Sequence, residues 1–142
     1  MGTLLLSANA RGEKEKIISV VEQFFAVLDS RDVKDAQKIL IPKGVSISLR
    51  EEGKGETIRI TNFQEFMDSF SNWKDNYKEI MSNPKVLIHN GIAVLWADYK
   101  FYINGKFSHC GVDAFSLIKI DNNWKIASII YTVEKGGGTP DQ

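Results

Sequence analysis

Two Asn-Gly pairs, Asn90-Gly91 and Asn104-Gly105, divide the C-terminal half of the chain into segments of alternating polar and apolar residues. Asn-Gly is the strongest short signal for a β-hairpin, because both central residues of a type I′ turn need a positive φ. Together with a polar turn at 121–123, these pairs predict an antiparallel meander. The expected strands are Tyr77–His89, Ile92–Ile103, Lys106–Ile120 and Trp124–Glu134. Pro84 lacks an N–H donor, which predicts an edge strand or a bulge there.

The N-terminal half predicts three helices and one hairpin. Apolar residues recur at helical spacing over 13–28, which indicates a long amphipathic helix. Asp32 is typical of a cap for a short second helix that Pro42 ends. Alternating residues at 45–50 and 57–61 predict a hairpin, and Asn62 is expected to cap a third helix over 63–70. The predicted fold class is therefore α+β.

The length of 142 residues and a hydrophobic content of 43% suit one domain, expected at 13–135. Residues 1–12 are interpreted as a flexible arm or a signal remnant, and residues 136–142 as a flexible tail. Leu4-Leu5-Leu6 followed by Ala8-Asn9-Ala10 is similar to the end of a secretory signal, although no basic segment precedes it. The compartment is left open between the cytoplasm and export to the periplasm or medium.

Charge and composition argue against several classes of partner. Eighteen basic residues balance eighteen acidic ones, so bulk charge favours neither nucleic acid nor anionic membrane. No apolar run is long enough to predict a membrane span. One cysteine and two histidines cannot build a Cys/His metal cluster, and we expect no metal. No cofactor motif is present, so no cofactor is expected.

The order of the predicted elements and one motif resemble the nuclear transport factor 2-like superfamily, closest to its bacterial SnoaL-like branch of uncharacterised proteins. The motif runs Trp96-Ala97-Asp98-Tyr99, then Asn104-Gly105-Lys106-Phe107-Ser108-His109-Cys110-Gly111-Val112-Asp113-Ala114-Phe115, then Asn123-Trp124-Lys125-Ile126. The resemblance implies a cone-shaped, cystatin-like fold, in which the helices pack on a strongly curved antiparallel sheet around a pocket. It also implies a homodimer formed through the outer face of the sheet.

One catalytic family of this superfamily is ketosteroid isomerase, and the resemblance allows a test of its chemistry. Its three catalytic positions fall on Phe24, Ser48 and Ser116 of this chain. Phenylalanine has no proton to donate to an enolate, and serine without a neighbouring base cannot abstract a carbon proton at neutral pH. Ketosteroid isomerase activity is therefore not expected.

The same alignment assigns the side chains of each strand to two faces. The pocket face is expected to take Leu95, Ala97, Tyr99, Phe101, Cys110, Val112, Ala114, Ser116, Ala127, Ile129, Tyr131 and Val133. The predicted ligand-binding residues are Tyr99, Tyr131, Ser116, Cys110, Phe24 and Ser48. An apolar cavity with a few hydroxyls suits a small apolar or aromatic ligand, although the same residues could simply fill a core.

The outer face is expected to carry Trp96, Tyr102, His109, Asp113 and Phe115, and aromatic rings with paired polar groups are typical of a dimer interface. Three titratable residues in this region are candidate catalytic residues: His109, Asp98 and Asp113. A bulge at Gly111 would change the face of His109 and Asp113 and bring them into the pocket.

Two functions remain open on the sequence. The first is a non-catalytic protein that binds an unknown small molecule, which the sequence favours. The alternative is a SnoaL-like enzyme that catalyses isomerisation, dehydration or cyclisation by proton transfer. The two differ in whether a titratable group reaches the pocket.

Overall fold

The computed structural model describes the backbone of residues 2–135, with side chains from residue 10 onward. Its elements are α1 (Gly2–Ser30), α2 (Val33–Ile39), β1 (Leu40–Glu52), β2 (Gly55–Asn62), α3 (Phe63–Asp68), the 3₁₀ helix η1 (Ser69–Asn72), β3 (Tyr77–His89), β4 (Ile92–Ile103), β5 (Lys106–Ile120) and β6 (Asn123–Val133). The strands form one curved sheet in the order β2-β1-β6-β5-β4-β3. All neighbours are antiparallel except β1 and β6, which are parallel. The α+β class, the hairpin and the meander are as the sequence predicted.

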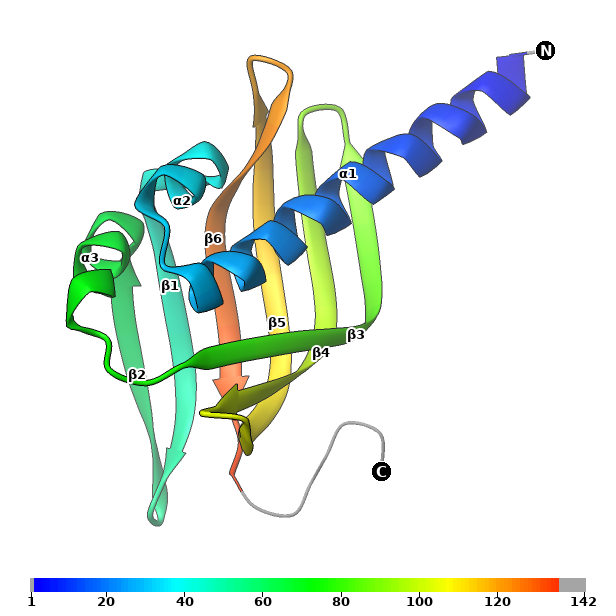
Figure 1. Ribbon diagram of the computed structural model, residues 1–142. Coiled ribbons are helices and arrows are strands. Elements are labelled where there is room, and N and C mark those ends of the chain that lie inside the picture. Colours follow the sequence, from blue (N-terminus) through cyan, green and yellow to red (C-terminus); the bar gives the residue numbers. More distant parts are fainter. Residues whose placement is uncertain (1, 136–142) are drawn as a thin grey trace.

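The helix α1 lies across the concave face of the sheet (Figure 1). The helix α2 packs against β1 and β6, and α3 packs against β1 and β2. The apolar stripe of α1, which includes Ile17, Val21 and Phe25, is buried against the sheet. Phe115 of β5 meets the ring of Phe25 at a centroid distance of 6.0 Å, in the centre of this core. Among the described residues, no helix combines the length and the apolar character needed to span a bilayer.

The predicted caps of the two short helices are confirmed. The Asp32 carboxylate accepts a hydrogen bond from the Asp35 N–H at 3.0 Å, and the Asn62 side chain accepts one from the Glu65 N–H at 2.8 Å. The first helix is longer than predicted, because it begins at Gly2 and includes the segment expected to be an arm. After Gly2, where the helix begins, the extension has one further glycine, Gly12, and one glycine weakens a helix by about 1 kcal/mol without ending it. The expected tail at 136–142 lies outside the described residues.

The strand β3 is an edge strand and carries a bulge, as Pro84 predicted. Its register with β4 shifts between Ser82 and Lys85, and Asn83 has a φ of 53°. The strand changes direction sharply, so that its first half crosses below α1 in Figure 1 while its second half runs along β4. This bend brings the beginning of β3 towards the concave side of the sheet.

A second bulge lies at Ser108 in β5. Tyr102 pairs with Phe107 and Phe101 pairs with His109, so Ser108 has no partner of its own. A regular hairpin after Asn104-Gly105 would pair Tyr99 with Cys110, whereas the extra residue makes Tyr99 pair with Gly111. Because side chains alternate with a period of two, this one residue inverts the faces of the rest of β5.

Candidate functional site

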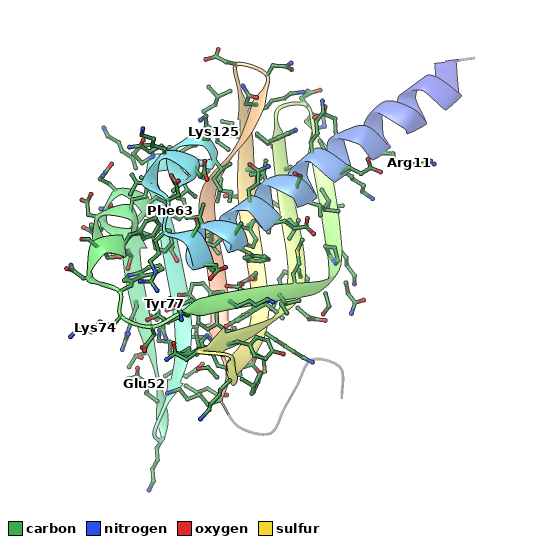
Figure 2. All side chains as sticks on the ribbon, in the orientation of Figure 1. Arg11, Glu52, Phe63, Lys74, Tyr77 and Lys125 are labelled. Carbon is green, nitrogen blue, oxygen red and sulfur yellow. The ribbon has the colours of Figure 1, made fainter. Side chains whose placement is uncertain are left out.

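A cavity of about 510 Å³ opens between the C-terminal end of α1, the α3–η1 segment and the concave face of the sheet. Figure 2 labels Tyr77, one of its wall residues, at the start of β3 and below the end of α1. Aromatic rings from six elements and the loop after η1 line it: Phe24, Phe66, Trp73, Tyr77, Tyr99, Phe101, His109 and Tyr131. The volume is that of a site for a small organic molecule.

Four of these rings form a continuous row across the cavity. Trp73 meets Tyr77 at a centroid distance of 5.1 Å, and Tyr77 meets Phe101 at 5.5 Å. Phe101 is stacked on His109 at 4.6 Å, with an angle of 20° between the rings. The bulge at Ser108 makes this stack possible, because it pairs His109 with Phe101. The row provides flat aromatic surface along one side of the cavity.

The loop that carries Trp73 is fixed to the end of α1 by Arg31. The Arg31 guanidinium donates to the Trp73 carbonyl oxygen at 2.7 Å and also to the Asp75 carbonyl oxygen. Arg31 itself has a φ of 58°, which turns the chain sharply after the helix. The aromatic wall is therefore held by hydrogen bonds to the loop backbone and not by ring packing alone.

Two carboxyl groups meet inside this cavity. Asp113 of β5 pairs with Ala97 and Tyr131, so its side chain enters the concave face, and only 2% of the residue is exposed. Glu79 belongs to the bent first half of β3, where half-buried and exposed residues alternate and Glu79 is half-buried. The bend brings its carboxyl group within hydrogen-bonding contact of Asp113.

Burial raises the pKa of both acids. Desolvation raises the pKa of Asp113 to about 6, although the hydrogen bond from Glu79 acts in the opposite direction. Desolvation and the neighbouring Asp113 charge raise the pKa of Glu79 well above its usual value. Among the described residues, no group hydrogen-bonds to Asp113 Oδ2. Both shifts favour the protonated form, so the pair holds a proton more tightly than free carboxyl groups do, and one buried carboxyl oxygen has free hydrogen-bonding capacity.

His109 is neutral at physiological pH. Desolvation, together with the smaller effect of the nearby charges of Arg50 and Lys135, lowers its pKa to about 4. Its Nδ1 lies 3.0 Å from the Ser108 hydroxyl. The ring thus contributes flat aromatic surface and a neutral imidazole, and not a positive charge.

Arg50 supplies the positive charge at the β1 side of the cavity. Its Nε donates to the Ser48 hydroxyl at 3.0 Å, and its Nη2 donates to the Tyr131 hydroxyl at 3.3 Å. These two hydroxyls come from neighbouring strands, because Ser48 pairs with Tyr131. The guanidinium is therefore oriented by the sheet itself.

Three of the predicted ligand-binding residues, Phe24, Tyr99 and Tyr131, border the cavity. The Tyr99 hydroxyl already donates to the Thr132 carbonyl oxygen, and burial raises the pKa of this hydroxyl. Tyr131 is the more available hydroxyl of the two. Ser48 is on the concave side but is buried, and it holds Arg50 instead of bordering the cavity.

The pocket-face assignment of β5 was wrong. Ser116 lies on the convex face, where its hydroxyl contacts that of Ser128, and Cys110 is buried on the same face beside Glu134. The bulge at Ser108, two residues before Cys110, is the cause. The candidate base Asp98 also lies on the convex face, because it alternates with the inward-facing Ala97 and Tyr99.

The assignment of His109, Asp113 and Phe115 to a dimer interface was wrong for the same reason. All three lie on the concave side: His109 and Asp113 border the cavity, and Phe115 is in the core. Trp96 and Tyr102 are on the convex face as expected. Of the three candidate catalytic residues, the structure brings His109 and Asp113 into the cavity and leaves Asp98 outside.

Glu79 and Arg50 border the cavity but were not predicted. Glu79 lies in the charged sequence Lys78-Glu79, which reads as the surface of an edge strand. Arg50 alternates with apolar residues near a charged turn, which reads as a solvent-facing position. Only the alternation of Tyr77, Glu79 and Met81 signalled that the acid shares a face with apolar residues. In the part of the chain that carries described side chains, no three His, Cys, Asp or Glu residues come together as metal ligands.

Sequence comparison identifies the family. Residues 12–132 match the profile of a family described as "Putative lumazine-binding". The chain belongs to this family. The match spans both the helix and the strands that border the cavity, so the whole site lies within the family domain. Among functionally curated proteins, none matches the sequence.

Solved structures confirm that this lumazine-binding family member has a nuclear transport factor 2-like, cystatin-like fold. A nuclear transport factor 2 superfamily protein from Salmonella enterica aligns over 94% of this chain and 99% of its own, with a TM-score of 0.69 and 16% identity. A cystatin-like protein from Novosphingobium aromaticivorans aligns over 97% and 92%, with a TM-score of 0.72 and 10% identity. A protein of unknown function from Mycobacterium tuberculosis aligns over 96% and 80%, with a TM-score of 0.74 and 12% identity.

Proposed function

We propose that this protein binds a small planar aromatic molecule in the cavity between α1 and the sheet. The observation that carries the proposal is the position of the carboxyl pair, Glu79 and Asp113, inside a cavity walled by aromatic rings. A ring system stacks on such walls, and a protonated acid pair both donates and accepts hydrogen bonds. The family description names lumazine, a planar heterocycle whose edge carries N–H groups and carbonyl oxygens, and this chemistry fits the pair.

Lumazine itself is the probe for a binding test. Trp73 borders the cavity, so a bound ring is expected to quench its fluorescence, and calorimetry gives the affinity. Asp113→Leu removes the carboxyl group at similar volume and is expected to weaken binding about tenfold or more. Asp98→Leu is the matched control, since Asp98 lies on the convex face, and is expected to leave the affinity unchanged. Equal affinity of the Asp113→Leu variant and the wild type would exclude the carboxyl pair as the recognition site.

A second candidate is proton-transfer catalysis, as in SnoaL-like enzymes. It is supported by the pKa of Asp113, about 6, in a cavity-facing position, because a carboxylate with a pKa near neutrality is an efficient general base. In such a reaction, Asp113 takes a proton from a carbon next to a carbonyl group and returns it to the same or a neighbouring carbon. Glu79, whose raised pKa favours the protonated form, is a proton donor beside it.

Deuterium uptake from D₂O into 2-tetralone, followed by proton NMR, tests this chemistry without knowledge of the substrate. Acceleration by the wild type and its loss in Asp113→Asn are expected if the pair transfers protons. No acceleration over buffer, in a preparation that binds lumazine, excludes carbonyl-linked proton transfer and leaves the binding function.

We also propose a homodimer formed through the convex face. One cross-strand row joins Ile60, Ile47, Ile130, Ala114 and Trp96 through direct pairs over β2, β1, β6, β5 and β4. Three of its four large members are well exposed, Ile60 by 66%, Ile130 by 53% and Trp96 by 55%, and Ile47 is half-buried. An exposed apolar row of this length is typical of an interaction surface, and a second copy of the chain presents the same row.

A further inference from the structure

One positively charged side chain, that of Arg50, borders the cavity, and the proposed function assigns it no contact with the aromatic ligand. The guanidinium of Arg50 is partly buried and borders the cavity. The cavity carboxyls are Glu65, Glu79 and Asp113, and Arg50 forms no ion pair with any of them within the described part of the chain. Placing a charge in a partly desolvated site without a counter-ion costs free energy, which a bound anion would recover.

The orientation of Arg50 is fixed in advance. Its hydrogen bonds to the hydroxyls of Ser48 and Tyr131 use Nε and Nη2. A guanidinium has five N–H groups, so donors remain available on the cavity side. The Tyr131 hydroxyl accepts from Arg50, and its own proton is available to a ligand oxygen. Together these donors match the two oxygens of a carboxylate.

The positive charge and the carboxyl pair lie apart. Asp113, Tyr131 and Ser48 form one cross-strand row, and Arg50 is two residues further along β1. Arg50 and Asp113 also lie two strands apart, with β6 between them, so their Cα positions are separated by roughly 12 Å, a span that leaves room for a bicyclic ring between the two side chains. His109 lies at the Arg50 side and is neutral, so it does not compete for an anion but contributes a flat surface for the ring.

We infer that the ligand of this cavity is an aromatic carboxylate, whose ring stacks on the Phe101–His109 side and whose carboxylate binds Arg50 and Tyr131. This inference rests on the proposed binding function and adds the ligand's charge. The opposite edge of the ring meets the carboxyl pair of Glu79 and Asp113. The chemical class is therefore a planar ring with an anionic group at one edge and hydrogen-bonding groups at the other.

The test uses two probes of nearly equal shape, 2-naphthoate and 2-naphthamide, titrated calorimetrically into the purified full-length protein. The wild type is expected to bind the carboxylate about tenfold or more tightly than the amide, as hydrogen bonds to a charged group allow. Arg50→Met is expected to remove that preference by weakening naphthoate about tenfold and changing naphthamide less than about twofold. Arg50→Lys keeps the charge but lacks the planar guanidinium that can bind both carboxylate oxygens, and it is expected to retain part of the preference.

Arg59→Met serves as the control variant. Arg59 lies on β2, outside the cavity lining, and its guanidinium pairs with Glu52 at 3.4 Å. It is expected to leave both affinities unchanged, which separates a local contact from a change in overall charge. Equal binding of the two probes by the wild type would overturn the anion site and leave the aromatic cavity standing. No binding of either probe, or of lumazine, at millimolar concentration would overturn the proposed function and this inference with it.

Discussion

Asp113 and His109 lie four residues apart on the same strand and titrate in opposite senses. Desolvation favours the uncharged form of each, so it raises the pKa of the acid and lowers that of the imidazole. Both groups are therefore neutral over part of the pH range in which their free forms are charged. Burial is the largest cause of both pKa shifts, and the stability of the protein is expected to vary with pH as a result.

The first prediction concerns Asp113→Asn. The folded state holds the Asp113 proton up to about pH 6, whereas the ordinary pKa of an aspartate is 3.8. The folded state thus binds more protons between these values, and the contribution of Asp113 to the free energy of unfolding falls as pH rises through this window. The loss is about 3 kcal/mol, since one pKa unit corresponds to about 1.4 kcal/mol. Urea denaturation is expected to show Asp113→Asn more stable than the wild type at pH 7, with the difference vanishing towards pH 4.

His109→Gln gives the internal check on that sign. The folded pKa of His109 is about 4 against an ordinary value of 6.5, so the wild type loses stability as pH falls through this window. The glutamine variant is expected to lack that acid loss. The difference in free energy of unfolding between variant and wild type is expected to change with pH in opposite directions for the two substitutions. The same direction for both would show that burial is not the source of the two pKa shifts.

At the scale of single elements, the sequence predicted the four strands of the meander to within a residue, whereas β1 begins at Leu40, five residues before its predicted start. The alternation along a strand fixes faces only when no residue is extra. In β4 the pattern ran unbroken, and Leu95, Ala97 and Tyr99 face inward as predicted. In β5 the bulge at Ser108 inverted the pattern. Ser108 carries no signal of its own, because serine is common in regular strands and in bulges alike.

Two cavity residues, Glu79 and Arg50, could not be predicted from the sequence for a different reason. Glu79 and Arg50 are charged, and a charged residue in a strand is usually solvated. Glu79 enters the cavity because β3 bends, and Arg50 because β1 pairs with the distant β6. Both depend on long-range pairing that local periodicity does not encode. Tyr131 and Phe24 could be predicted because apolar and aromatic residues face inward by default.

Gly111 gives the prediction for β5 as an element. A Cβ atom there would lie 2.5 Å from the Thr132 carbonyl oxygen and even closer to the Thr132 hydroxyl, which accepts from the Val112 N–H at 3.1 Å. Backbone cannot yield as a flexible side chain does, so Gly111→Ala is expected to destabilise the protein by about 2 kcal/mol. Thermal unfolding followed by circular dichroism measures the change.

Gly12→Ala is the matched substitution on α1. Nothing lies within 4 Å of a Cβ atom at Gly12, and alanine favours a helix over glycine by up to about 1 kcal/mol. A rise in midpoint for this variant and a fall for Gly111→Ala are expected. A Gly111→Ala protein as stable as the wild type would show that β5 and β6 can separate there without cost.

At the scale of the whole molecule, the two faces of the sheet have separate roles in the proposals above. The concave face encloses the cavity, and the convex face presents the apolar row from Ile60 to Trp96. A change on the convex row is therefore expected to alter assembly and not ligand affinity.

Ile130→Lys tests that separation. A lysine in the middle of the row places two like charges in a twofold interface, so the variant is expected to sediment as a monomer where the wild type sediments as a dimer. Val33→Lys, on α2 and 40% exposed, is the control and is expected to keep the dimer. A wild type that sediments as a monomer at every concentration would refute the proposed dimer, whereas lumazine binding would stand.

The parallel pairing of β1 with β6 has a consequence for how the chain reaches its fold. The strand β1 (Leu40–Glu52) can pair with β6 (Asn123–Val133) only after the long segment between them has folded back to bring the two strands together. Contacts this far apart in sequence slow folding, since the chain gives up entropy before those contacts form. On the ribosome, the hairpin of β1 and β2 would emerge early and stay undocked until the last strand is synthesised. The apolar side chains of this hairpin would meanwhile be accessible to chaperones. Substitutions in β1 and β2 are therefore expected to change the expression yield as much as substitutions in the cavity.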